Sequence, residues 1–341
     1  MGKNSLHRKF VLCMIAAAAA IAVCCVGAIC LGAFRIEISK VFEVLFSAIG
    51  GDAIMDNTNT VIFNIRIPRI IMALTAGAGL ASSGAAFQSL FANPLATPDT
   101  LGVANGASFG AALGLLLGMG SFGVQLLALG FGVLAVLLVF AVTRGIAAKR
   151  PSMVMVILAG LVISSLFSAL VSLIKYVADP QDTLPTITFW LMGRFSNITQ
   201  KNMLLSIPLI AGGTILVFLL RFRLNALSLS EEEARSIGVN LRLIRVLVIA
   251  AASMTTAAVV SVCGVIGWVG LLIPHIARML FGNDNRYVVP ASILFGALFM
   301  LLVDTLARCV SASEIPVSIL TAVIGAPVFI LLLRKTGGID T

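Results

Sequence analysis

The sequence predicts an all-α polytopic membrane protein with about ten transmembrane helices, including one short broken helix. Hydrophobic residues make up 60% of the 341 positions, and charged residues make up only 11%. Apolar runs long enough to cross a bilayer recur along the whole chain. Helices suit such runs because the bilayer core offers no water to the backbone polar groups, which a helix pairs within itself.

The spans can be placed in order along the chain. The first apolar run is longer than the apolar region of a signal peptide and has no clear cleavage site, so we interpret it as a span. The amphipathic stretch KVFEVLFSAIG after it fits either a helix along the membrane interface or an ordinary ordered loop. The predicted spans are 11–33, 70–91, 103–120, 122–142, 153–175, 203–220, 246–266, 268–281, 287–307 and 316–333.

One region does not fit a simple series of spans. Residues 246–282 are too many for one span and few for two, and GVIGWVG and Pro274 interrupt them. We therefore expect one full helix, a glycine-rich bend and a short helix. Irregular backbone at membrane depth persists only where protein or a water-filled path covers it.

The distribution of basic residues predicts the orientation. An even number of spans puts both termini on one side, and about twice as many lysines and arginines fall on that side as on the other. The richer side is expected to be cytoplasmic, in a multi-pass protein of the cytoplasmic membrane. The net charge of +9 then reflects orientation in the lipid bilayer, and no nucleic-acid partner is expected.

Glycine recurs at every fourth position after the second span. In a helix this spacing gives a smooth ridge that lets a neighbouring helix approach closely, and GAGLASSGAA in the preceding span has the same character. The ridge predicts tight packing, and smooth ridges could also slide against each other in a transporter. The glycines are Gly102, Gly106, Gly110, Gly114 and Gly118.

The connection NPLATPDTLGVANG between the second and third spans is polar and contains two prolines that break a helix. It fits either the wall of a translocation path near the cytoplasmic mouth or a plain polar connection. The candidate path residues are Asn93, Pro94, Thr97, Pro98, Gly102 and Asn105.

The sequence lacks the residues that several kinds of catalytic, nucleotide-binding or metal site require. The stretch GASFG resembles a serine nucleophile motif at Ser108, but it lies in a predicted membrane helix, and the chain has only two histidines. No P-loop is present, so an ATP-driven process needs an ATPase on another chain. No cofactor or metal site is expected, and His275 is interpreted as structural. Asp304 is the only acid within a predicted span, which disfavours the rival interpretation as a stand-alone proton-coupled secondary transporter.

A charged segment, LSLSEEEARSIGVNLRLIR, lies in the cytoplasmic loop 221–245. Ser230 is a suitable N-cap, acids occupy the first turn, and Gly238 is suited to end the helix. A short helix there fits a docking element for a soluble motor, or simply a solvated helical hairpin. The candidate coupling residues are Glu231, Glu232, Glu233, Ala234, Arg235 and Gly238.

One short motif and three longer blocks of the sequence resemble a known protein family. EEARSIG resembles the E-A-A-x-x-x-G coupling motif of binding-protein-dependent ABC importers, with Glu233 in place of the usual first alanine. RIPRIIMALTAGAGLASSGAAFQSLFANPLATPDTLGVANGAS, GWVGLLIPHIARML and SEIPVSILTAVIGAPVFILLLRK resemble blocks of the FecCD permease family in the same order. The resemblance covers nearly the whole chain and implies a single permease domain, 1–341.

The resemblance also implies partners and a substrate class. We expect a homodimer, or a heterodimer with a similar permease, two ATP-binding cassette subunits on the cytoplasmic face and an extracytoplasmic solute-binding protein. The expected substrate is an iron–siderophore type of chelate, with haem, cobalamin or an oxyanion as alternatives. By resemblance, the fifth and tenth spans line the path, and Arg66, Arg69 and Arg308 receive carboxylates of the solute-binding protein. Pairing of these arginines with acids such as Asp304, or with lipid headgroups, is the alternative.

Overall fold

The computed structural model describes residues 3–32, 36–50, 57–146, 153–196, 198–229, 231–236, 238–311 and 313–335. Over these residues the secondary structure is helical, with no strand. The helices are α1 (Lys3–Cys30), α2 (Ile38–Gly50), α3 (Asn57–Thr60), η1 (Val61–Arg66), α4 (Ile67–Leu90), η2 (Pro98–Leu101), α5 (Val103–Leu116), α6 (Ser121–Ile146), α7 (Met153–Val177), α8 (Thr183–Leu191), α9 (Gln200–Leu224), η3 (Asn225–Ser228), α10 (Glu231–Ser236), α11 (Leu241–Cys263), α12 (Val269–Phe281), α13 (Asn285–Cys309) and α14 (Val317–Lys335).

The predicted spans correspond to helices of the structure. Within the part of the chain that the structure describes, seven helices are long and apolar enough to cross a membrane, and α5, α12 and α14 are shorter apolar helices. The second span differs most from the prediction, because α3, η1 and α4 run on from one another and start the helix at Asn57 rather than near residue 70. A short helix, α8, lies between α7 and α9, and the amphipathic stretch after the first span forms a helix, α2.

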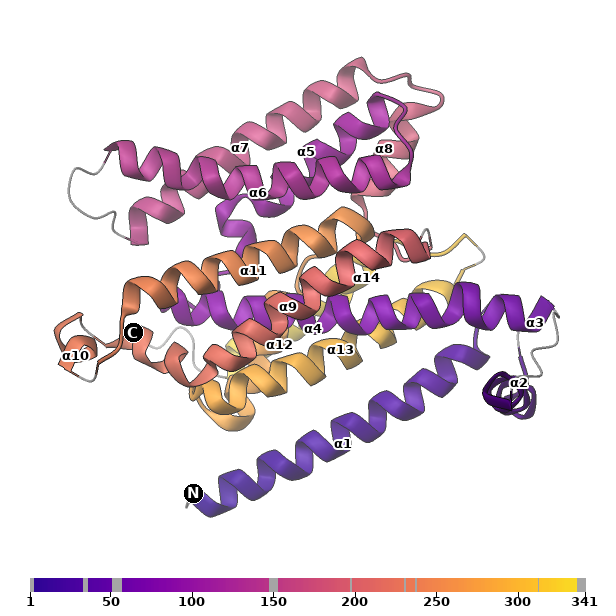
Figure 1. Ribbon diagram of the computed structural model, residues 1–341, viewed down its shortest axis with the longest axis horizontal. Coiled ribbons are helices and arrows are strands. Elements are labelled where there is room, and N and C mark those ends of the chain that lie inside the picture. Colours follow the sequence, from indigo (N-terminus) through magenta and orange to yellow (C-terminus); the bar gives the residue numbers. More distant parts are fainter. Residues whose placement is uncertain are drawn as a thin grey trace.

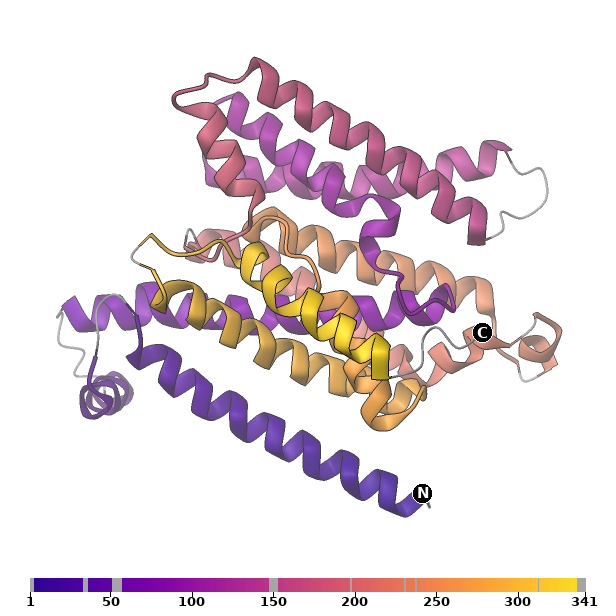
Figure 2. The ribbon, with the colours of Figure 1, turned by 180° about the vertical axis from the view of Figure 1, so that it is seen from behind.

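Helix α4 lies at the centre of the molecule and packs against α9, α11, α12 and α13 (Figure 1). Helices α5, α6, α7 and α8 form a group on one flank, and α1 lies on the opposite flank (Figures 1 and 2). The most apolar part of the α3–α4 span is 78% buried, whereas that of α1 is 6% buried. Small residues allow this central position, because they let neighbouring backbones come close.

Glycines on α4 form its closest helix contacts. A Cβ atom added at Gly77 would strike the backbone carbonyl of Gly296 on α13, and one added at Gly84 would strike that of Gly270 on α12. GAGLASSGAA therefore packs closely against two neighbouring helices, α13 and α12, as its small residues predict.

The glycine ridge after η2 is shorter than predicted. Gly106, Gly110 and Gly114 lie in α5 and face α6, where Gly110 meets the backbone of Leu127. Gly102 is not part of this ridge: it stands before α5 with φ +75° and packs against Ser164 of α7. Gly118 lies beyond the end of α5, because the chain turns there with φ +66°. The four-residue spacing continued past both ends of the helix, where the backbone is no longer helical.

The helices alternate in direction and define two ends of the molecule. The start of α1, the segment α10 and the last turn of α14 lie at one end, here named the α10 end (Figures 1 and 2). Helices α2 and α8 and the start of α14 lie at the opposite end, here named the α8 end.

The predicted broken helix is confirmed. Helix α11 ends at Cys263 and α12 begins at Val269, with Trp268 between them at φ +72°. Protein covers this break, because Arg194 donates a backbone hydrogen bond to the carbonyl of Cys263 at 2.8 Å. The start of α14 joins the same region, where the backbone N–H of Val317 donates to the carbonyl of Gly193 at 3.0 Å.

Candidate translocation and coupling sites

The polar connection between α4 and α5 is an ordered turn. The side chain of Asn93 accepts a hydrogen bond from the backbone N–H of Leu95 at 2.9 Å. Pro94 precedes the short helix η2, Pro98 is the first residue of that helix, and Gly102 turns the chain into α5. Among the predicted path residues, Asn93 and Pro94 are exposed, Thr97 and Asn105 are half-buried, and Pro98 is buried. The structure therefore does not gather all six on one surface.

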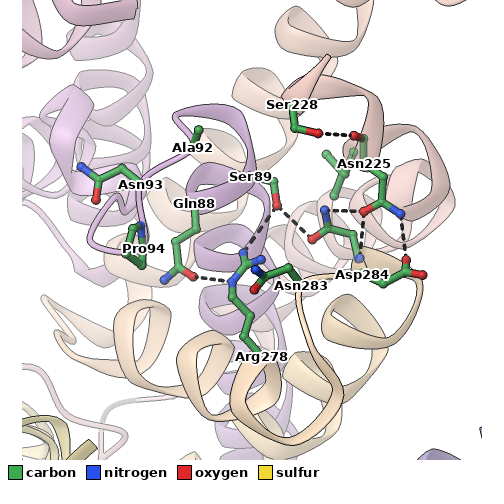
Figure 3. Close-up of a pocket in the computed structure, with 12 residues that line it drawn as sticks. Gln88, Ser89, Ala92, Asn93, Pro94, Asn225, Ser228, Arg278, Asn283 and Asp284 are labelled. Carbon is green, nitrogen blue, oxygen red and sulfur yellow. Dashed lines mark hydrogen bonds between the residues drawn. The ribbon is translucent and has the colours of Figure 1, made fainter. Parts of the chain in front are cut away.

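Asn93 and Pro94 line a polar pocket at the α10 end with a volume of about 550 Å³. Its walls come from the ends of α4, α9 and α12 and from the start of α13, so the pocket joins segments that are far apart in sequence (Figure 3). The lining residues are Gln88, Ser89, Ala92, Asn93, Pro94, Leu224, Asn225, Ser228, Arg278, Asn283, Asp284 and Asn285.

One wall of this pocket is a group of amide hydrogen bonds, here named the Asn225 group (Figure 3). The side-chain oxygen of Asn225 accepts from the backbone and the side-chain nitrogens of Asn285, both at 2.9 Å. Its side-chain nitrogen donates to Asp284 at 2.7 Å. Ser89 of α4 donates to the side chain of Asn285 at 2.9 Å. The start of the loop after α9 is thereby joined to the end of α4 and to the start of α13.

Asp284 is the N-cap of α13 and lies outside the spans. Partial burial raises the pKa of its carboxyl, but hydrogen bonds from Arg286 and Asn225 outweigh this and hold the pKa below its usual value. The carboxylate therefore stays charged and continues to accept the hydrogen bond of Asn225.

Arg278, in the last turn of α12, forms the other wall. Its guanidinium donates to Gln88 at 3.3 Å and to the carbonyl of Ala85 at 3.3 Å, both on α4. Gln88 in turn donates to the carbonyl of Gly270 at 3.3 Å. A cation at this place also complements the negative end of the α12 dipole. These contacts fasten both ends of the short helix to α4.

Sequence reasoning missed this pocket. Polar Gln88 and Ser89 at the end of an apolar helix, and the run Asn283–Asn285 after the broken helix, were the available signals. Neither signal showed that the two stretches meet.

The charged segment after η3 contains the expected short helix, α10. Ala234 is fully buried and belongs to the main apolar core, whereas Glu232 and Glu233 are exposed. Gly238 adopts φ +71°, and the backbone N–H of Val239 returns to the carbonyl of Ala234 at 2.8 Å, a common way to end a helix. The predicted N-cap Ser230 and the side chains of Glu231 and Arg235 lie outside the described residues.

The three arginines expected to dock a partner are buried in this structure, with exposed fractions of 4% for Arg66, 5% for Arg69 and 8% for Arg308. Arg69 donates to Asp304 at 2.8 and 2.9 Å and to Glu314 at 2.9 Å. For Arg69 this is the alternative considered from sequence, pairing with an acid such as Asp304.

The neighbouring arginines complete this cluster at the α8 end. Arg308 lies 3.8 Å from the carboxylate of Asp304 and donates to the carbonyl of Ala28 at 2.7 Å. Arg66 donates to the carbonyl of Ile29. Docking by these side chains stays a prediction, and it requires them to leave their present contacts. We name Arg66, Arg69, Asp304, Arg308 and Glu314 the Asp304 cluster.

Two residues considered for chemistry have packing environments. Ser108 is 5% exposed within α5. The ring of His275 lies 5.5 Å from that of Phe329, so it contacts α14. Among the described residues, no group of three His, Cys, Asp or Glu side chains is arranged to hold a metal ion.

Comparison with known proteins gives consistent matches over most of the chain. Residues 6–335 match the model of the FecCD transport family. The chain is 41% identical to the molybdate import system permease protein MolB of Haemophilus influenzae, with 89% of this chain and 90% of that protein covered. It is 39% identical to a probable iron chelatin transport system permease protein of Helicobacter pylori, with coverage of 84% and 86%.

The chain is also similar in fold and sequence to a solved structure. It belongs to an ABC transporter assigned to the metal-chelate type and captured in an inward-facing conformation. The TM-score is 0.85 at 38% identity, with 94% of this chain and 98% of the other covered.

Proposed function

The chain belongs to the FecCD transport family, and on that premise we propose that it is the permease subunit that carries an iron chelate in an ATP-driven importer. The permease class is carried by the match over residues 6–335 together with the fold shared with an ABC transporter. Such a subunit moves a solute and does not catalyse a reaction, and ATP is hydrolysed on a separate chain. Relatives named for iron chelatin transport support the choice of substrate.

A molybdate-type oxyanion is the second candidate substrate. The relative named for molybdate import shares more identical residues with this chain than the relatives named for iron chelatin, at 41% against 39% and 38%. Relatives named for haem and cobalamin are 36% identical. The permease fold is common to all of them, so the solute must be identified by transport.

The α10 end faces the cytoplasm in this proposal, since the loops at that end carry most of the lysines and arginines. Two ATPase subunits dock there, with α10 as the coupling element. The burial of Ala234 supports this role, because it ties the exposed acids of α10 to the main core and thus to the spans. The Asn225 group carries movement of the same segment to the starts and ends of α4 and α13.

A second permease copy packs beside this one and completes the path. Helices α7 and α14 support this proposal, since they expose large apolar side chains that either lipid or a second subunit can cover. On α7 these include Leu158, Leu161, Val162 and Leu166, and on α14 they include Ile319, Val323 and Leu331. The candidate path residues Asn93, Pro94, Thr97, Pro98, Gly102 and Asn105 lie toward the α10 end of this path.

The solute-binding protein docks at the α8 end. In this proposal its carboxylates engage Arg66, Arg69 and Arg308 after these side chains exchange their internal partners. Glu314 is the partner best placed to leave, because 37% of its side chain is exposed whereas Asp304 is fully buried. Such docking weakens with added salt, since charges at a protein surface are screened beyond about 10 Å at 0.1 M salt.

Transport by the reconstituted complex tests the proposed function. The chain is placed in liposomes with its cognate ATPase, and uptake is measured with the cognate solute-binding protein and either a ferric tris-catecholate or radioactive molybdate. ATP-dependent uptake of the ferric complex supports the iron-chelate proposal, and uptake of molybdate alone replaces it with the oxyanion. Uptake without the ATPase, driven by a proton gradient, would overturn the importer assignment.

A further inference from the structure

Two pockets meet at the α8 end, and the larger one borders the Asp304 cluster through Arg69 and Glu314. The smaller has a volume of about 180 Å³ and is lined in part by Ser121, Trp190 and Asn202. The larger has a volume of about 350 Å³ and is lined in part by Phe189 and Ser313. Arg194 lines both of them. The larger pocket lies between α8 and the start of α14, which both lie at this end (Figure 2).

The backbone at Arg194 is held by the end of α11, by the loop before α12 and by the start of α14. Its N–H donates to the carbonyl of Cys263 at the helix break, and the carbonyl of Gly193 accepts from Val317 at the start of α14. Gly193 has φ +70°, and a Cβ atom there would come within 2.6 Å of the carbonyl oxygen of Val265. Only glycine fits this crossing without strain, so the position of Arg194 is firmly set.

The side chain of Arg194 has no acidic partner among the residues that the structure describes. Arg69, which lines the same larger pocket, is neutralised by Asp304 and Glu314. Glu314 also lines the larger pocket, but its ion pair is with Arg69. Arg194 is therefore the cation of these two pockets that the structure leaves without an ion pair among the described residues. Partial exposure keeps its guanidinium accessible.

The other lining groups fit the environment of a bound anion. Hydroxyl groups come from Ser121 and Thr186 in the smaller pocket and from Ser196 and Ser313 in the larger one. Aromatic rings of Trp190 and Phe189 add apolar surface. Binding sites typically combine apolar walls with a few polar groups that set orientation and specificity.

We propose that Arg194 binds the anionic part of the transported solute at the mouth of the permease opposite α10. This inference rests on the proposed function and adds the charge class of the solute, an oxyanion or a chelate that carries carboxylate or catecholate groups. Guanidinium suits this role, because it stays charged and grips two oxygens of an anion with parallel hydrogen bonds. Its place between α8 and α14 puts the contact beside the break in the α11–α12 helix.

The test compares Arg194→Gln and Arg194→Lys with the wild-type complex, with Lys201→Gln as the matched control. Lys201 also lies at the α8 end, but its ammonium sits 5.0 Å above the ring of Phe122 and lines neither pocket. Uptake of ferric tris-catecholate and of molybdate is measured in proteoliposomes over a range of loaded solute-binding protein. Binding of the same protein to the complex is measured separately.

We expect Arg194→Gln to lower uptake of the anionic probe about tenfold, a change equivalent to about 1.4 kcal/mol. Arg194→Lys should recover much of the rate, and Lys201→Gln should transport like the wild type. Binding of the solute-binding protein and ATPase activity without it should stay unchanged in Arg194→Gln.

Three outcomes would overturn this inference. Normal uptake by Arg194→Gln, while the wild type transports, removes the contact but leaves the proposed function intact. Loss of solute-binding protein attachment in Arg194→Gln makes Arg194 a docking residue for that protein. Wild-type uptake of a neutral solute such as cyanocobalamin, and of neither anionic probe, removes the assigned charge class as well as the iron-chelate proposal.

Discussion

The two ends of the molecule are held together by different chemistry. At the α8 end, the Asp304 cluster joins α1, α4, α13 and the loop before α14 through buried charges. At the α10 end, the Asn225 group and Arg278 join α4, α9, α12 and α13 mainly through neutral amide and hydroxyl partners. These contacts border an open pocket of about 550 Å³.

This difference predicts different resistance to movement. Breaking a buried ion pair by removing one partner costs about 3–5 kcal/mol, whereas a typical neutral hydrogen bond contributes about 1 kcal/mol. The α8 end should therefore move as a unit, and the α10 end can exchange its hydrogen bonds at low cost. Contacts of the second kind suit the proposed coupling role of the α10 end, because they can be exchanged as the segment moves.

The largest effect is expected at Asp304. Replacement by Asn keeps the shape but leaves the buried guanidinium of Arg69 with only Glu314 and removes the charge beside Arg308. We expect a loss of about 3–5 kcal/mol in the free energy of unfolding, seen as a lower midpoint of thermal unfolding in lipid.

Glu314→Gln is the matched control, because it changes the same arginine from the partly exposed side. A half-exposed pair contributes roughly 0–1 kcal/mol. Equal midpoints for the two variants would show that the buried charges do not hold the α8 end.

The second prediction concerns α10. Ala234→Pro places proline in a short helix at a buried position, which costs about 3 kcal/mol locally. Because the segment is attached to the core only through a few residues, the spans should remain folded. We expect loss of ATPase co-purification and of uptake.

Gln200→Pro is the control for this change at the opposite end. Gln200 is the exposed first residue of α9, a position where proline is well tolerated. It should bind the ATPase and transport normally. Unchanged co-purification and uptake in Ala234→Pro would rule out α10 as the docking element.

The third prediction concerns the packing of α5 against α6, which is independent of the polar contacts at the two ends. Gly110→Ala on α5 would push its new Cβ atom into the backbone of Leu127 on α6. Overpacking of this kind costs about 1–3 kcal/mol, and the thermal midpoint should fall. Gly130→Ala on α6 meets no atom within 4 Å and should match or exceed the wild-type midpoint. Equal midpoints for both variants would mean that α5 and α6 are free to separate.

The sequence predicted the local features of this fold well. Spans, the break after Cys263 and the end of α10 near Gly238 depend on apolar runs, glycine and proline within a few residues of one another. Gly102 shows the limit of such patterns. Its spacing fits a helix ridge, but the prolines before it turn the backbone to φ +75°.

The contacts that hold the two ends depend on residues far apart in the chain. Arg69 and Asp304 are 235 positions apart, and Ser89 and Asn285 are 196 apart. Spacing along one helix revealed the neighbours Asp304 and Arg308, but it could not show that Arg69 lies against the same carboxylate. The burial of Arg69 follows from that long-range pairing.

The smallest effect on stability is expected at Asn225. Asn225→Ala removes the acceptor of two hydrogen bonds from Asn285 and the donor to Asp284. Asn225 and Asp284 are half-buried, and all three residues border an open pocket. Water can therefore replace the lost partner, and we expect a loss of about 1 kcal/mol. The functional effect should be larger, because the loop 221–245, which we propose as the coupling segment, is then no longer bonded to α13 near its start. ATPase activity should stop responding to loaded solute-binding protein, while its basal rate and the thermal midpoint stay near the wild type.

Ser228→Ala removes only a bond to the backbone carbonyl of Asn225 and should keep the response. A fall in thermal midpoint as large as that of Asp304→Asn would show that the α10 end is as rigid as the α8 end, and the difference between them would not explain coupling.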